Sequence, residues 1–77
     1  MDIKMTDITL HINEPTSHDD REALRDSLLG LDGVMAAAYH DEKPHLMMIE
    51  YDPDIINSTQ FLTSASDRGL HAQLIGL

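Results

Sequence analysis

The sequence predicts a small α+β domain with the order strand, helix, strand, strand, helix, strand. Three observations lead to this order. Apolar and polar residues alternate near both ends and in the middle of the chain, as expected for strands with one buried face. Two intervening segments carry apolar residues at helical spacing. Clusters of proline, glycine, aspartate and serine separate the segments, which places turns between them.

The first strand is expected at residues 8–12, and Pro15 ends that segment. A helix should begin near His18, because Thr16 or Ser17 offers a hydroxyl N-cap and an aspartate follows three residues later. Its apolar side consists of Ala23, Leu24, Leu28 and Leu31, and its polar side of Arg21, Glu22, Arg25 and Asp26. Gly30 and Gly33 are expected to end it.

Residues 34–39 and 46–51 are expected to form a hairpin around the polar turn at residues 41–44. The segment 52–54 breaks the second of these strands. Asn57 or Ser58 then caps a second helix that carries Phe61, Leu62 and Ala65, and Gly69 ends it. Residues 70–75 alternate again and form the last strand.

Two halves of this kind interlock as a ferredoxin-like βαββαβ sandwich, in which both helices cover one face of a four-stranded antiparallel sheet. Residues 1–77 then form a single domain, and the sequence leaves the order of residues 1–7 open. The period-2 pattern assigns eleven residues to the helix-covered face. They are Ile8, Leu10, Ile12, Ala37, Tyr39, Met47, Ile49, Tyr51, Leu70, Ala72 and Leu74.

Composition restricts the function of the chain. It has 77 residues and a formal charge of -9, which opposes binding to nucleic acid or to anionic membranes. The absence of cysteine excludes disulfides, thiolate metal sites and thiol chemistry. The opening residues have no signal-peptide pattern, and the longest uncharged stretch, 33–40, is too short to span a membrane, so we expect a cytoplasmic protein without membrane insertion.

Four segments come in the order and spacing of a known family: Leu31-Asp32-Gly33-Val34, then Ala37 and Tyr39, then Tyr51-Asp52-Pro53, and finally residues 69–74. In these residues the chain resembles heavy-metal-associated domains, the family of copper chaperones and of the N-terminal modules of metal-pumping P-type ATPases. The likeness extends from about Ile8 to Leu74 and implies the same fold.

The family's metal motif, Gly-Met-x-Cys-x-x-Cys, is missing. The resemblance places residues 14–20 over that loop, with Ser17 and Asp20 at the two cysteine positions. A serine hydroxyl and a carboxylate are poor ligands for Cu(I), which prefers soft sulfur donors. The resemblance therefore implies the fold without the thiol metal chemistry.

Histidine and carboxylate ligands are the alternative metal donors. His18 with Asp20 could bind a borderline metal if Met5, Glu14 or His71 supplied a third ligand; the competing explanation is that the acids cap the helix, whose N-terminus favours negative charge. His11 and His71 are expected on neighbouring strands and could hold Zn²⁺, Cu²⁺ or Ni²⁺ weakly. The competing explanation is that both are ordinary exposed strand residues. His40 and His45 are expected to be turn residues.

A small apolar patch is expected on the open face of the sheet. Leu46 and Met48 point there by parity, beside Ala36, Ala38 and Ile75, and an exposed apolar patch typically marks a partner site. A slip of one residue at the hairpin would bury these side chains instead. The first helix adds a second candidate surface, formed by the acids Asp19, Glu22 and Asp26.

These observations favour a non-enzymatic binding module without a resident cofactor. No nucleophile, base and orienting group come together in the pattern, and no phosphate loop is present. The acidic charge predicts docking to a protein partner with a basic patch, with self-association as the other mode. The rival hypothesis is a metal-binding or metal-trafficking domain that uses histidine, carboxylate or methionine ligands.

Overall fold

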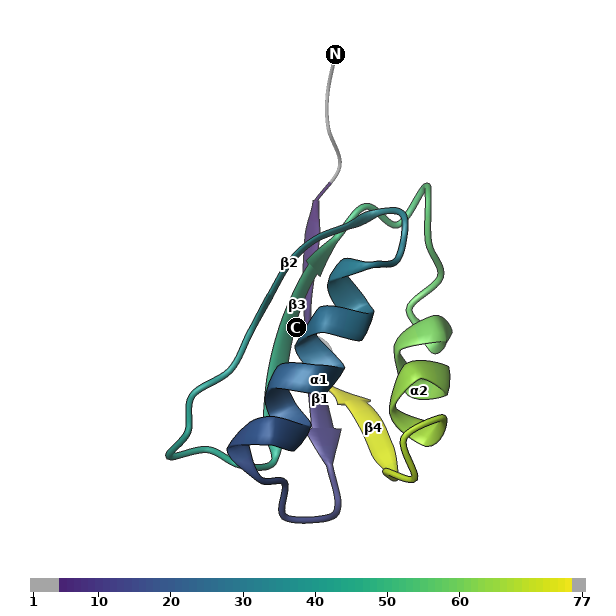
Figure 1. Cartoon of the computed structure of the whole chain (residues 1–77). Helices are drawn as coiled ribbons and strands as arrows, with labels where there is room; N and C mark the ends of the chain where they lie inside the picture. Colours follow the sequence, from purple (N-terminus) through teal and green to yellow (C-terminus); the bar gives the residue numbers. More distant parts are fainter. Residues whose placement is uncertain (1–4, 76–77) are drawn as a thin grey trace.

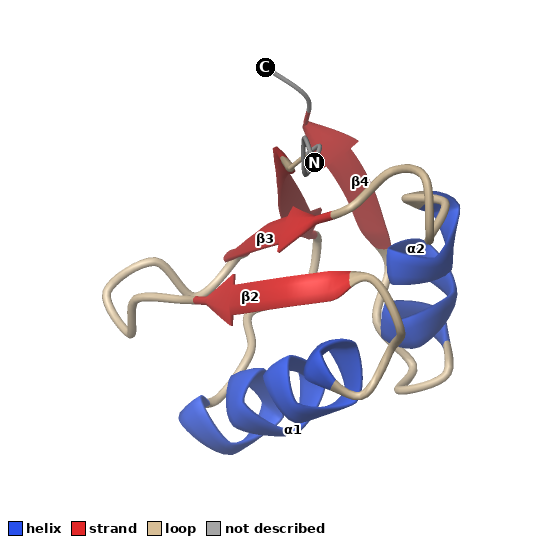
Figure 2. Cartoon of the chain, turned by 90° about the horizontal axis from the view of Figure 1, so that it is seen from above, coloured by secondary structure: helices blue, strands red, loops and turns tan. Residues whose placement is uncertain are grey.

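The structure is a computed structural model that describes residues 5–75. Its four strands and two helices follow one another in the predicted order (Figure 1). The elements are β1 (Thr6–Ile12), α1 (His18–Leu29), β2 (Val34–Ala38), β3 (Leu46–Tyr51), α2 (Thr59–Ser66) and β4 (Ala72–Ile75). The strands form one sheet in the order β2-β3-β1-β4, and all neighbours are antiparallel. Both helices lie on one side of it (Figure 2). The ferredoxin-like sandwich is therefore confirmed.

The bounds of the first and the last strand of the chain differ from the expected ones. Strand β1 begins two residues earlier, because Thr6 and Asp7 pair with Tyr51 and Glu50. Strand β4 begins only at Ala72, because the N–H of Leu70 still bonds to a carbonyl of α2, that of Ala65. Residues 1–4, whose order the sequence left open, lie outside the described residues.

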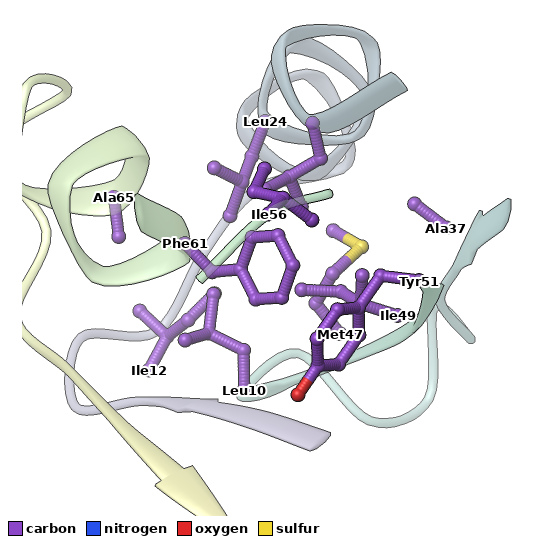
Figure 3. Close-up of a cluster of buried hydrophobic side chains, with 11 residues drawn as sticks. Leu10, Ile12, Leu24, Ala37, Met47, Ile49, Tyr51, Ile56, Phe61 and Ala65 are labelled. Atoms are coloured by element: carbon purple, nitrogen blue, oxygen red, sulfur yellow. The ribbon is translucent and has the colours of Figure 1, made fainter. Parts of the chain in front are cut away.

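The core lies between the sheet and the helices, as the parity of the strands predicts. All eleven residues assigned to the helix-covered face are buried or packed against the buried cluster. Phe61 projects from α2 into the middle of this cluster and meets the ring of Tyr51 edge-on, with 5.0 Å between the ring centroids (Figure 3). Such edge-to-face pairs add stability beyond the area that they bury.

The two helices are held in place differently. Ser17 caps α1 with its side chain, whereas the N-cap residue of α2, Ser58, makes no side-chain bond to the helix. Helix α2 has only 8 residues and depends on the burial of Phe61 and Ala65 for its stability. Within residues 5–75, neither helix has the length and apolar character needed to cross a bilayer.

Candidate functional site

The crossover from β1 to α1 contains the positions that the family resemblance aligns with the metal motif. Ser17 and Asp20 form a capping box: the N–H of Asp20 donates to Ser17 Oγ, and the N–H of Ser17 donates to Asp20 Oδ2, both at 3.1 Å. The N–H and the hydroxyl of Ser17 lower the pKa of Asp20. Both side chains are thus occupied by the backbone at the start of the helix.

A buried guanidinium connects this crossover to the β2–β3 turn. Arg21 is only 4% exposed, and its Nη1 donates to the carbonyl of Thr16 at 2.5 Å and to the Thr16 hydroxyl at 2.9 Å. Its Nη2 donates to Asp41 at 2.9 Å, and its charge lies 5.6 Å from the centre of the Tyr39 ring. The Thr16 hydroxyl donates to the carbonyl of Pro44, also in the turn. The sequence placed Arg21 on the polar side of α1, and that assignment is wrong.

His18 also points to the turn and not to Asp20. Its Nδ1 lies 2.9 Å from the Asp41 carboxylate, which raises the pKa of His18. The hydrogen bonds from His18 and Arg21 lower the pKa of Asp41. Beside them, the Tyr39 hydroxyl donates to Glu22, and this bond raises the pKa of Tyr39 to about 12. The two members of the expected His18 and Asp20 pair therefore have different partners.

His11 and His71 are also separated by the register of the strands. His11 pairs with Gln73 in the β1–β4 ladder, and its ring stacks on that of His45 with 5.8 Å between centroids. His71 lies at the end of the ladder, where its N–H donates to Glu14 at 2.8 Å and its ring Nδ1 lies 2.5 Å from the same carboxylate. These bonds lower the pKa of Glu14 to about 2.

Four of the histidines thus lie in three separate contacts, His11 with His45, His18 with Asp41 and His71 with Glu14. Among residues 5–75, no three histidine, aspartate or glutamate side chains are grouped so that they could hold a metal ion. Glu14 and His71 contact each other, although both were considered as third ligands for a metal at His18. Their contact links the β1–α1 crossover to the residue before β4.

The open face of the sheet carries a groove of about 380 Å³, which we call the open-face groove. Its lining includes Asp7, Thr9, Ala36, Ala38, Met48 and Glu50. The sheet register places Met48 between Thr9 and Ala38, so β3 keeps the predicted parity and the hairpin does not slip. Leu46, the other predicted residue, lies beside His11 at the end of β3.

Two carboxylates lie at one end of this groove. Asp7 and Glu50 are direct partners across β1 and β3, an arrangement in which like charges repel. The ion pairs within residues 5–75 use other acids, namely Glu14, Glu22, Asp26 and Asp41. On the helix surface, by contrast, Arg25 lies 3.9 Å from Glu22 and 3.7 Å from Asp26. Asp19 is exposed there.

The open-face groove and the acids of α1 lie on opposite sides of the molecule, because α1 covers the other face of the sheet (Figure 2). The candidate interaction residues named from the sequence therefore belong to two separate surfaces. Asp7 and Glu50 were not among them, although the alternation along both strands places them on the open face with Met48. The buried Arg21 network had no comparable signal, because it depends on a contact across 20 residues.

Comparison with known proteins identifies the fold. No protein-family model matches the chain, and no curated protein sequence matches it significantly. Solved structures do: a copper-binding domain of the P-type ATPase HMA7 superposes with a TM-score of 0.81 at 15% identity, over 92% of this chain and 95% of that one. The chain has the fold of the heavy-metal-associated domains.

Two further structures agree with this assignment. Oxidized MerP from Ralstonia metallidurans CH34 has a TM-score of 0.82 at 13% identity, over 92% of this chain and 97% of that chain. The CopZ metallochaperone has a TM-score of 0.79 at 19% identity, over 88% of this chain and its own full length, 100%. The resemblance expected from the sequence is thus confirmed as a likeness of fold over nearly the whole heavy-metal-associated domain.

Proposed function

We propose that this chain is a non-enzymatic docking module that binds a basic protein partner through the open face of its sheet. The observation that carries the proposal is the open-face groove, in which apolar side chains of β2 and β3 lie next to two carboxylates. Exposed apolar surface with a charged rim is typical of protein interaction sites. The heavy-metal-associated fold serves here as a scaffold for recognition.

The crossover supports docking over thiol-based metal transfer. The chain has no cysteine, and the side chains of Ser17 and Asp20 bond to the start of α1. Thr16 and Arg21 fasten the same segment to the β2–β3 turn. A segment held in this way is better suited to maintaining the shape of the domain than to opening around an ion.

The charge of the chain favours a different protein over a second copy as the partner. Five lysines and arginines face 14 aspartates and glutamates, so two copies repel each other at long range. A basic partner gains from the same field, and its association should weaken as salt is added. Nucleic acid is disfavoured as a partner by the same charge.

The test is affinity capture with the wild-type chain, with Met48→Gln and with Asp19→Asn as a control on the helix side. We expect the wild type and the control to retain the same basic protein, and Met48→Gln to lose it. Retention should fall between about 50 and 500 mM salt, because a tenfold rise in ionic strength shortens the screening length about threefold. Equal retention by Met48→Gln would show that the partner binds elsewhere.

Binding of a metal by histidine is the second candidate function, and the observation that favours it is the closeness of two imidazoles, His11 and His45, whose ring centroids are 5.8 Å apart. Neutral imidazole is the form that binds metal, so the affinity for metal should fall as acid is added. Titration with Zn²⁺, Cu²⁺, Ni²⁺ and Cu(I), followed through the imidazole resonances, tests it. Resonances that stay unchanged at one equivalent of metal would exclude this function.

A further inference from the structure

The open-face groove has an apolar part and an anionic end. Their arrangement restricts the kinds of side chain that could bind in the groove. The apolar part is formed by Ala38 of β2 and Met48 of β3, which pair with each other, and Ala36 lies beside Glu50. The anionic end is formed by Asp7 and Glu50, which face each other across the β1–β3 ladder. The inference drawn below rests on the proposed docking function.

The distance between the apolar part and the anionic end of the groove follows from the spacing of residues along β3. Met48 and Glu50 are on the same face of β3, two residues apart, which corresponds to about 7 Å at the rise of an antiparallel strand. A side chain lying along the groove must therefore have an apolar stem of about this length and a cationic end. Lysine, with its flexible four-carbon stem and terminal ammonium, has this form.

The spacing of the carboxylates favours an ammonium group over a guanidinium. Directly paired residues of an antiparallel ladder have Cβ atoms about 5 Å apart, so two separate carboxylates converge on the groove from neighbouring strands. The three donors of an ammonium can be shared between such carboxylates, whereas the planar fork of arginine matches a single carboxylate. The cation would also remove the repulsion between Asp7 and Glu50.

We infer that the open-face groove receives a lysine side chain of the partner, with its stem against Met48 and Ala38 and its ammonium between Asp7 and Glu50. Within the larger interface with the partner, the lysine selects the partner and fixes its position. The occupant is thus a lysine exposed on a basic protein surface, reached from the side of the sheet opposite the helices (Figure 2).

Small lysine analogues test this inference directly on the full chain. The probe is Nα-acetyl-lysine N-methylamide, and the matched control is the norleucine analogue, which keeps the apolar stem and lacks the ammonium. We expect the lysine probe to shift the amide resonances of the groove, from Asp7 to Thr9 and from Met48 to Glu50, at millimolar concentrations. The norleucine analogue should bind at least tenfold more weakly. Equal binding of both, or shifts outside the groove, would overturn the inference.

A pair of double variants separates the anionic end from the overall charge. Asp7→Asn with Glu50→Gln should weaken the lysine probe at least fivefold, while Asp19→Asn with Asp26→Asn, the same change in charge on α1, should leave it within twofold. The arginine analogue should bind more weakly than lysine, and tighter binding of arginine would overturn the choice of side chain.

The outcome can be distinguished from failure of the docking proposal. If the Asp7→Asn, Glu50→Gln variant captures the partner as well as the wild type does, and Met48→Gln does not, docking on the open face stands and the lysine inference is wrong. If Met48→Gln also captures the partner, the docking site itself is elsewhere.

Discussion

Nη2 of Arg21 in α1 lies 2.9 Å from Oδ1 of Asp41 in the β2–β3 turn, and this contact joins the first turn of α1 to the β2–β3 turn. Asp41 is 61% exposed at its side chain, whereas that of Arg21 is 5% exposed, so the carboxylate lies at the solvent end of a buried cation. The Arg21 Nε is buried without a hydrogen-bond partner in the described part of the chain. The hydrogen bonds to Thr16 and the contact with the Tyr39 ring offset the free-energy cost of burying this unpaired N–H group.

Truncation of Arg21 is expected to destabilise the domain. Arg21→Ala removes three hydrogen bonds and the packing of the side-chain stem, and we expect a loss of about 2–3 kcal/mol in the free energy of unfolding. Urea denaturation measures it. Arg68→Ala, at an exposed position, is the control and should stay within about 0.5 kcal/mol of the wild type. Similar midpoints for both variants would mean that the Arg21 network contributes little.

The His18–Asp41 pair makes stability depend on pH near neutrality. Asp41 raises the pKa of His18 above its usual 6.5, so the folded state binds the proton more tightly than the unfolded state does. The resulting stabilisation is fully present below pH 6.5 and is lost as the pH rises through the higher, folded pKa. The contribution of this pair to the unfolding free energy of the wild type should therefore fall as the pH rises above 6.5.

His18→Gln should lose this particular pH dependence, whereas His40→Gln, at an exposed histidine next to the same turn, should keep it. Urea midpoints measured at several pH values provide the comparison. A wild-type slope that persists unchanged in His18→Gln would assign the effect to another group.

The Glu14–His71 contact predicts sensitivity to acid. Glu14 has a folded pKa of about 2 against a usual value of 4.5, chiefly because it accepts the N–H of His71. A carboxyl group with a lowered pKa stabilises the fold above its unfolded pKa, and the effect disappears as the pH falls towards 2. Glu14→Gln should therefore be less stable than the wild type at pH 6 and approach it as the pH falls from 4.5 towards 2, as followed by urea midpoints. A constant difference between the two proteins would contradict this assignment.

The sequence was sufficient to predict the architecture, because the alternation of apolar and polar residues in each strand indicates which face is buried. Leu10, Met47 and Leu74 all follow this pattern, and their burial needed no knowledge of distant contacts. The pairing of polar groups was harder to predict. Whether His18 contacts Asp20 or Asp41 depends on where a turn 23 residues away folds back, and His11 meets His45 for the same reason. Local sequence propensity contains no information on which distant polar residues will meet in the fold.

Gly33 should tolerate substitution less well than Gly69. Both have a positive φ, 94° and 76°, so alanine pays a backbone cost of about 1–2 kcal/mol at either position. At Gly33, an added Cβ would also lie 2.8 Å from Ile55 Cγ2 and 2.9 Å from Ile56 Cγ2, while at Gly69 it meets nothing within 4 Å. Gly33→Ala should therefore be more destabilising than Gly69→Ala in thermal unfolding. Equal losses would show that Ile55 and Ile56 move aside freely.

Introducing two thiols at the crossover should create a binding site for monovalent copper. Ser17 and Asp20 lie next to each other at the start of α1, and cysteines there would present soft donors whose pKa the helix N-terminus lowers. The double variant Ser17→Cys, Asp20→Cys should compete with bicinchoninate for one equivalent of Cu(I), and the wild type should not. Loss of the capping box should cost it about 1 kcal/mol of stability. Ser17→Ala, Asp20→Ala is the matched control, with the same loss of stability and no copper binding. A folded cysteine variant that fails to compete would show that these two positions do not correspond to the family's metal ligands.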